Sequence, residues 1–183
     1  YNLSRDQAAH YMFLFSLGMI VGSPLVGILS DRLRNRKKVS IFFALCYVLV
    51  WVALLFWNGG MPPLGAMPFL VLAMGFFGAS QIMAFPCVNE VNHSSLAGTA
   101  TAVANIGPFL SVSILQPLCG HVLESYWPGT YLNGAKIFPL IAYRSAFFLC
   151  FCFALLGFVA VLFVKETYCC NIYSTLVRKK RAR

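Results

Sequence analysis

The sequence predicts an all-α integral membrane protein with five membrane-spanning helices. Of its 183 residues, 60% are hydrophobic and 10% are charged, whereas about 25% are charged in an ordinary soluble domain. The mean hydropathy is +0.76, and the apolar residues form long runs separated by short polar links. A soluble chain of this composition could not cover its surface with polar groups. We therefore expect a single membrane domain that ends in a basic tail, residues 165–183.

A helix needs about 20 mostly apolar residues to cross the roughly 30 Å hydrocarbon core of a bilayer. Five segments meet this requirement, and the fourth of them is the most polar: 8–29, 39–57, 67–85, 97–119 and 145–164. In the first segment Gly18 and Gly22 are four residues apart. Small residues at this spacing let two helix backbones approach closely, so we expect these glycines to pack against another helix.

The cations predict how the chain crosses the membrane. Of the 14 Lys and Arg residues, five lie in the link at 32–38 and six lie between Lys165 and the C-terminus. Positively charged links stay in the cytoplasm, and the predicted spans place both segments on the same side. The C-terminus is then cytoplasmic and the N-terminus is outside, which suggests a fragment that lacks at least one earlier span.

The link between the first two spans contains one acid, Asp31, followed by Arg32, Arg36 and Lys37. Asp31 falls near the C-terminal end of a helix, where the helix dipole disfavours a negative charge. We therefore expect a nearby cation, or the positive N-terminus of another helix, to stabilise it. Alternatively, only the positive charges of this link matter, as anchors of topology.

The pattern Gly27-x-x-x-Asp31-Arg32-x-x-x-Arg36-Lys37 resembles the signature loop of the major facilitator superfamily. That loop joins the second and third helices of the family and recurs between the eighth and ninth. The family usually has Gly two residues after the first Arg, where this chain has Arg34. The second copy of the loop is generally the more degenerate, which favours that assignment.

Two further stretches resemble the same family. Residues 89–124 are similar to the segment that enters and forms the eleventh helix of bacterial members, and residues 165–167 are similar to the end of such a protein. The resemblance implies helices 8–12 of a transporter that works by alternating access. It also implies a partial C-terminal six-helix bundle in a bacterial inner membrane, with the N-terminal bundle as its missing partner.

Uncharged polar residues in the third and fourth spans are candidates for a cavity or for contacts between helices: Ser80, Gln81, Asn105 and Gln116. A polar group in hydrocarbon is costly unless it is satisfied, so these side chains should face protein or water. Interhelical hydrogen bonding is the favoured role of Asn105 and Gln116, while cavity lining is equally plausible for Gln81. Gly107-Pro108 should bend the fourth span, because proline removes a backbone hydrogen bond.

Several functions are excluded or less favoured. The sequence has no paired nucleophile and base, no metal-ligand spacing and no phosphate-binding glycine loop, so we expect no enzyme, metal or cofactor. The cations lie at helix ends, which argues against nucleic acid as a partner. The favoured function is transport of a small solute, with proton coupling left open. The alternatives are a truncated remnant or half-transporter that does not transport alone, and a scaffold whose tail, residues 178–183, binds anionic lipid.

Overall fold

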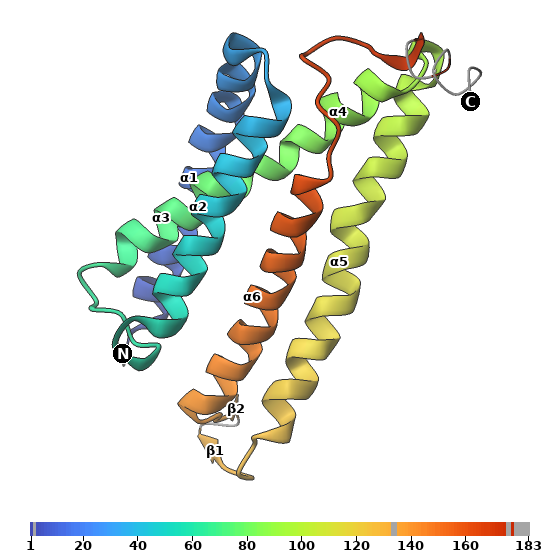
Figure 1. The fold of residues 1–183 in the computed structure, drawn as a ribbon. Coiled ribbons are helices and arrows are strands. Elements are labelled where there is room, and N and C mark those ends of the chain that lie inside the picture. Colours follow the sequence, from blue (N-terminus) through green and yellow to red (C-terminus); the bar gives the residue numbers. More distant parts are fainter. Residues whose placement is uncertain (2, 133–134, 175–176, 178–183) are drawn as a thin grey trace.

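The computed structural model describes residues 1, 3–132, 135–174 and 177 (Figure 1). Five helical segments in this part of the chain are long and apolar enough to cross a membrane, which confirms the predicted all-α membrane fold. They are formed by α1 (Arg5–Leu33), α2 (Arg36–Phe56), α3 to α4 (Met67–Val91), α5 (Ala97–Ser125) and α6 (Leu140–Leu162). The basic residues 178–183 lie outside the described residues.

Short elements complete the chain between these helices. Two 3-10 turns, η1 (Trp57–Gly59) and η3 (Ser94–Leu96), follow α2 and precede α5. A two-stranded antiparallel hairpin, β1 (Tyr131–Leu132) and β2 (Ala135–Lys136), lies in the loop between α5 and α6. The helices extend beyond several of the predicted spans, because hydropathy identifies the apolar middle of a helix and not its polar ends.

The third span is interrupted. It consists of α3 (Met67–Gly78), the 3-10 segment η2 (Ala79–Met83) and α4 (Ala84–Val91). Through this arrangement α3 packs against α1 and α2, while α4 reaches the beginning of α5 (Figure 1). The fourth span, in which a bend was expected, is one continuous α-helix through Pro108 and Pro117. The third span therefore connects the α1–α2–α3 group to the α5–α6 pair.

Helix α1 packs directly on α3 through glycines. A Cβ atom on Gly18 or Gly22 would collide with the backbone of Phe76, and one on Gly75 would collide with the backbone of Phe15. Close approach of this kind replaces side-chain contacts by backbone contacts, which is how helices associate in lipid. Beside this contact lies a small buried core of Val26, Val39, Phe43 and Met83.

Helix α5 differs from the other spans because none of its residues is buried. It contacts α6, and near its beginning it contacts α4. Polar residues of α5, including Asn105, Ser113 and Gln116, are exposed at its surface. Such a helix has large faces that the described part of the chain does not cover.

Candidate functional site

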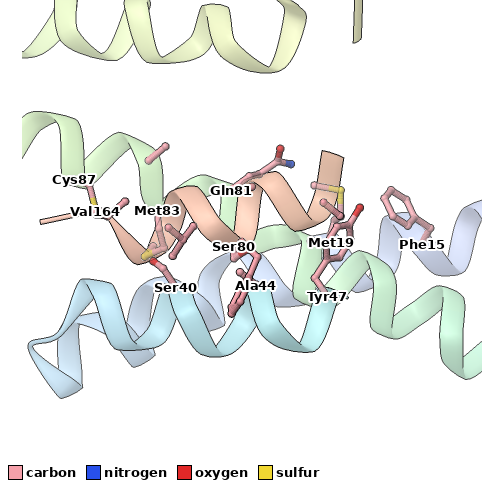
Figure 2. A pocket seen from close by; sticks show the side chains of 16 residues that line it. Phe15, Met19, Ser40, Ala44, Tyr47, Ser80, Gln81, Met83, Cys87 and Val164 are labelled. Atoms are coloured by element: carbon pink, nitrogen blue, oxygen red, sulfur yellow. The ribbon is translucent and has the colours of Figure 1, made fainter. Parts of the chain in front are cut away.

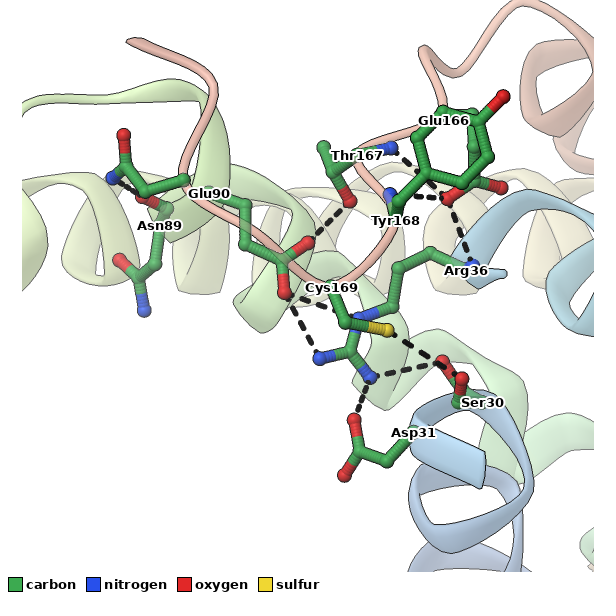
Figure 3. Close-up of polar contacts among 10 residues, drawn as sticks. Ser30, Asp31, Arg36, Asn89, Glu90, Glu166, Thr167, Tyr168 and Cys169 are labelled. Carbon is green, nitrogen blue, oxygen red and sulfur yellow. Dashed lines mark hydrogen bonds and ion pairs between the residues drawn. The ribbon is translucent and has the colours of Figure 1, made fainter. Parts of the chain in front are cut away.

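A polar cluster joins the ends of α1, α2 and α4 to the segment that follows α6 (Figure 3). We call it the Arg36 cluster, and it consists of Ser30, Asp31, Arg36, Glu90, Glu166 and Thr167. These residues are separated by up to 137 positions in the sequence. The fold nevertheless brings them together because α1 ends, α2 begins and α4 ends at the same end of the molecule (Figure 1).

Arg36 is the centre of the cluster, and its side chain is 9% exposed. One terminal nitrogen donates to Ser30 Oγ at 2.9 Å and to Asp31 Oδ1 at 2.5 Å. The other terminal nitrogen and Nε donate to Glu90 Oε1 at 2.9 and 3.2 Å. The guanidinium fork thus binds two carboxylates and a hydroxyl at once, a geometry that a lysine could not reproduce.

Glu166 caps the beginning of α2. Its carboxylate accepts the backbone N–H of Arg36 at 3.0 Å and that of Lys37 at 2.8 Å, and Asn35 accepts that of Lys38 at 2.8 Å. The first N–H groups of a helix have no partner within the helix. A residue that is 130 positions away from Arg36 therefore satisfies donors that the local sequence leaves open, next to the positive end of the helix dipole.

The ionised form of Glu166 is favoured by these contacts. Burial by itself would raise its pKa, but the backbone N–H groups of Tyr168, Lys37, Arg36 and Thr167 outweigh burial and hold the pKa below its usual range. A carboxylate that accepts several backbone N–H groups is stabilised in its charged form. Glu166 is thus a fixed negative charge at the beginning of α2.

The segment after α6 is also fastened to α4. Thr167 is fully buried, and its hydroxyl donates to Glu90 Oε2. The Ile172 N–H donates to the Glu90 carbonyl at 2.8 Å, and the Asn171 amide donates to the Asn89 and Asn92 carbonyls. Because Glu90 also binds Arg36, it connects α4, α2 and this segment.

The predicted motif residues are placed in different ways. Asp31 and Arg36 form an ion pair, and Asp31 remains 64% exposed. The stabilising cation expected for Asp31 therefore comes from within the same link. Lys37 contributes its backbone N–H, Arg32 is exposed, and no atom lies within 4 Å of a Cβ built on Gly27.

Arg34 occupies a left-handed backbone conformation, with φ 47° and ψ 39°, at the end of α1. Glycine adopts this conformation at little cost, whereas a residue with a Cβ does not. The related motif usually has glycine at this position, and the left-handed backbone conformation explains why glycine is favoured there. Asn35 follows and caps the beginning of α2, so only residues 34 and 35 lie between α1 and α2.

Sequence reasoning did not include Glu90, Glu166 and Thr167 among the site residues. A signal was present, because the chain has only five acids. Three of them, Asp31, Glu90 and Glu166, meet at the end of the molecule that carries the cations. Acids on the side of the membrane that carries most of the cations indicate specific partners, although the sequence does not say which acid pairs with which cation.

A cavity of about 490 Å³ lies among α1, α2, η2, α4 and α6 (Figure 2). Ser80 and Gln81, two of the predicted polar candidates, line it together with Ser40 and Tyr47. The remaining lining is mostly apolar and includes small residues of facing helices, such as Ala154 and Gly157. The volume is within the usual range for small-molecule sites, about 300 to 1,000 Å³.

The other predicted polar residues lie elsewhere. Asn105 and Gln116 line two shallow grooves on α5, away from Ser80 and Gln81.

The predicted packing glycines, Gly18 and Gly22, lie at the α1–α3 contact. Within the described ranges, no group of three His, Cys, Asp or Glu side chains could hold a metal ion. The arrangement can hold helix ends together and enclose a small molecule.

Comparison with known proteins identifies the family. The family model described as Major Facilitator Superfamily matches residues 1–168. No curated protein and no solved structure gave a significant match. The family match covers the five spans and extends into the Arg36 cluster as far as Thr167. The chain therefore belongs to the major facilitator superfamily, whose members are transporters.

Proposed function

We propose that this chain is the C-terminal portion of a secondary active transporter, which moves a small solute across a membrane by alternating access. The observation that carries the proposal is the Arg36 cluster, which fastens one end of α1, α2 and α4 to the segment after α6. Helices fastened in this way move as one body. Alternating access requires such bodies to rock against each other around a solute site.

The residues that line the cavity support the inference that the solute has no strong charge. No Asp, Glu, Lys or Arg is among its lining residues, and its polar groups are the uncharged Ser40, Tyr47, Ser80 and Gln81. A charged solute in an apolar cavity would need an opposite charge or a metal to offset its desolvation. We infer a small, neutral, partly apolar solute, held in place by hydroxyl and amide groups.

Exposed polar side chains on α5 support a larger assembly. The side-chain amides of Asn105 and Gln116 would each be costly to place against lipid, and neither is buried by the described residues. A second helical bundle or a water-filled cavity on this face would satisfy them. We therefore propose an N-terminal bundle as the partner, with helices α1 to α6 corresponding to the family's helices 8–12.

The cations support the orientation. In our proposal the end with the Arg36 cluster faces the cytoplasm, in a bacterial inner membrane, because this end carries the link at 32–38 and the beginning of the basic tail. There the cluster closes the cytoplasmic ends of the helices while the solute site is open to the outside.

Uptake measurements test the proposal. Sealed vesicles that contain the protein as its gene encodes it should accumulate at least one neutral solute from a panel, and Gln81→Leu should reduce that uptake. Repeating the assay with and without a proton gradient decides whether protons drive it. If neither neutral nor charged solutes accumulate, and co-expression of a separately encoded N-terminal half restores nothing, the chain is a non-transporting remnant and the proposal is wrong.

The proposed role of Asp31 in closing the cytoplasmic ends of the helices has its own test. Asp31→Asn removes the charge that pairs with Arg36 and leaves its shape, so we expect slower uptake from vesicles that contain normal amounts of folded protein. A normal uptake rate together with normal conformational exchange would mean that only the cations of this link matter.

A further inference from the structure

Two cysteines from different helices meet inside the membrane-spanning part of the protein. Cys119 lies in the last two turns of α5 and Cys150 lies in the first half of α6. Their Sγ atoms are 3.7 Å apart, and both thiols are reduced and partly buried. Nothing in the proposed transport function uses this pair.

The two sulfurs are in direct contact. Either thiol can donate to the other at this distance, and the Cys119 sulfur also lies 3.9 Å from the Ala146 carbonyl oxygen of α6. Each sulfur is therefore already in contact with the atom to which a disulfide would join it.

We propose that Cys119 and Cys150 are a redox-sensitive pair, which a peroxide that enters the lipid converts to a disulfide joining α5 to α6. A bond of about 2.05 Å requires the sulfurs to approach by less than 2 Å from their present contact. Rotation about the Cα–Cβ bonds is the movement by which we expect the two sulfurs to approach.

The chemistry proceeds in two balanced steps. One thiol breaks the O–O bond of hydrogen peroxide, and its sulfur becomes a sulfenic acid while one water is released. The second thiol attacks that sulfur, the S–S bond forms, and the hydroxyl group leaves as a second water with the proton of the attacking thiol. The two thiols lose two electrons and two hydrogens in total, and peroxide is reduced to two waters.

The position of the pair gives the bond a structural consequence. Helix α5 is covered on few sides. In the described residues it is held mainly by α6 and, near its own beginning, by the end of α4. The loop between α5 and α6 is closed by the Lys136–Glu124 ion pair, and the Lys136 ammonium lies 4.2 Å from the centre of the Trp127 ring. A disulfide would fix the helices to each other a little deeper than this loop, so oxidation would oppose their separation.

The test combines peroxide treatment with cleavage of the loop. Membranes that contain the intact protein are exposed to hydrogen peroxide, trypsin cleaves after the exposed Lys136, and the products are separated without reductant. We expect the α5 and α6 fragments to migrate together, to separate when a reductant is added, and to weigh two hydrogen atoms less when joined than their reduced sum.

Matched variants assign the bond. Cys119→Ser and Cys150→Ser should each abolish the joined product. Cys152→Ser removes another thiol of α6, and Cys87→Ser removes a thiol of α4. Both variants should leave the joined product unchanged. Oxidation of the exposed Cys170 shows that peroxide acted in every sample. The proposal is wrong if Cys170 is oxidised while the fragments of the unchanged protein separate, or if the joined product persists without Cys119 or Cys150.

Discussion

The α1–α3 contact and helix α5 represent two different ways of placing a helix in this protein. At the α1–α3 contact, Gly18, Gly22 and Gly75 leave no room for a Cβ atom. On α5, no atom lies within 4 Å of a Cβ built on Gly98, Gly107 or Gly120. The same residue type is thus essential for packing in one region and unconstrained in the other. The comparison teaches that the α1–α3 contact is closed by backbone packing, whereas the glycine positions of α5 have space available for further neighbours.

The largest expected effect comes from filling the glycine contact. Gly75→Leu would drive side-chain atoms into the backbone of Phe15 on α1, which cannot retreat without separating the helices. We expect a loss of more than about 3 kcal/mol of stability, the upper range for overpacking, and little folded protein after extraction in mild detergent. Gly107→Leu is the control and should be tolerated in this chain. Equal unfolding temperatures for the two variants would contradict the comparison.

The next effect comes from the Arg36 cluster. Arg36→Met removes the donors of Glu90 and Asp31 and leaves Glu90, whose side chain is 12% exposed, with fewer partners. We expect a loss of about 2 to 3 kcal/mol, because a buried charged group is left partly unsatisfied. Thermal unfolding in detergent measures it.

The control for this variant is Lys136→Met, which breaks a more exposed ion pair with Glu124. Exposed pairs contribute about 0 to 1 kcal/mol, so its unfolding temperature should change little. If Lys136→Met lowered the unfolding temperature as much as Arg36→Met, burial would not explain the contribution of the Arg36 cluster to stability.

A smaller, pH-dependent effect is expected at Glu166. Glu166→Gln keeps the shape and removes the charge at the beginning of α2, which should cost about 1 kcal/mol at neutral pH. Because the pKa of Glu166 is lowered in the folded protein, its contribution is fully present above the usual glutamate pKa of about 4.3. It is lost as the pH falls through the lowered value.

The difference in unfolding temperature between the unchanged protein and Glu166→Gln should therefore disappear on strong acidification. Glu124→Gln, at the opposite end of the molecule, serves as the comparison. A difference that stayed constant from neutral pH to strong acid would mean that the charge of Glu166 does not stabilise the cap.

The smallest expected effect is an increase in stability. Arg34 has a positive φ of 47°, which costs a residue with a Cβ about 1 to 2 kcal/mol, although glycine makes the unfolded chain more flexible. Arg34→Gly should therefore raise stability by about 0.5 kcal/mol, and Arg34→Ala should not. Any loss of stability in Arg34→Gly would show that the Arg34 side chain has a contact of its own that outweighs the backbone strain.

The sequence predicted the membrane fold, the five spans and the pairing of Asp31 with a cation, because apolar runs and charge runs are local signals. It did not predict how Glu90 and Glu166 reach Arg36, since their contacts depend on which helix ends meet in three dimensions. The break at η2 was also missed. The bend expected at Pro108 stays a prediction, since α5 is a continuous helix through that residue. The cost of polar groups in lipid indicated that Ser80 and Gln81 face either a cavity or another helix, but it did not decide between the two, and the size of the cavity depends on packing alone.

The central claim is that the Arg36 cluster fastens the segment after α6 to the ends of α1, α2 and α4, and Cys169 reports on it directly. Its thiol lies against the Ser30 carbonyl at 3.5 Å, and burial raises its pKa, as do the carboxylates around it, against the opposing effect of Arg36. The neighbouring Cys170 is exposed and serves as an internal reference. The decisive measurement is the rate at which a charged maleimide alkylates each thiol, in the unchanged protein and in Arg36→Met.

We predict that Cys169 reacts much more slowly than Cys170 in the unchanged protein. Because Arg36 lowers the pKa of Cys169, its removal alone would slow alkylation, so we predict that Arg36→Met accelerates Cys169 severalfold, by exposing the thiol, when the two proteins are compared above the pKa of Cys169, while the rate of Cys170 stays the same. If Cys169 reacts as fast as Cys170 in the unchanged protein, or if its rate does not change in Arg36→Met, the cluster does not hold this segment in place.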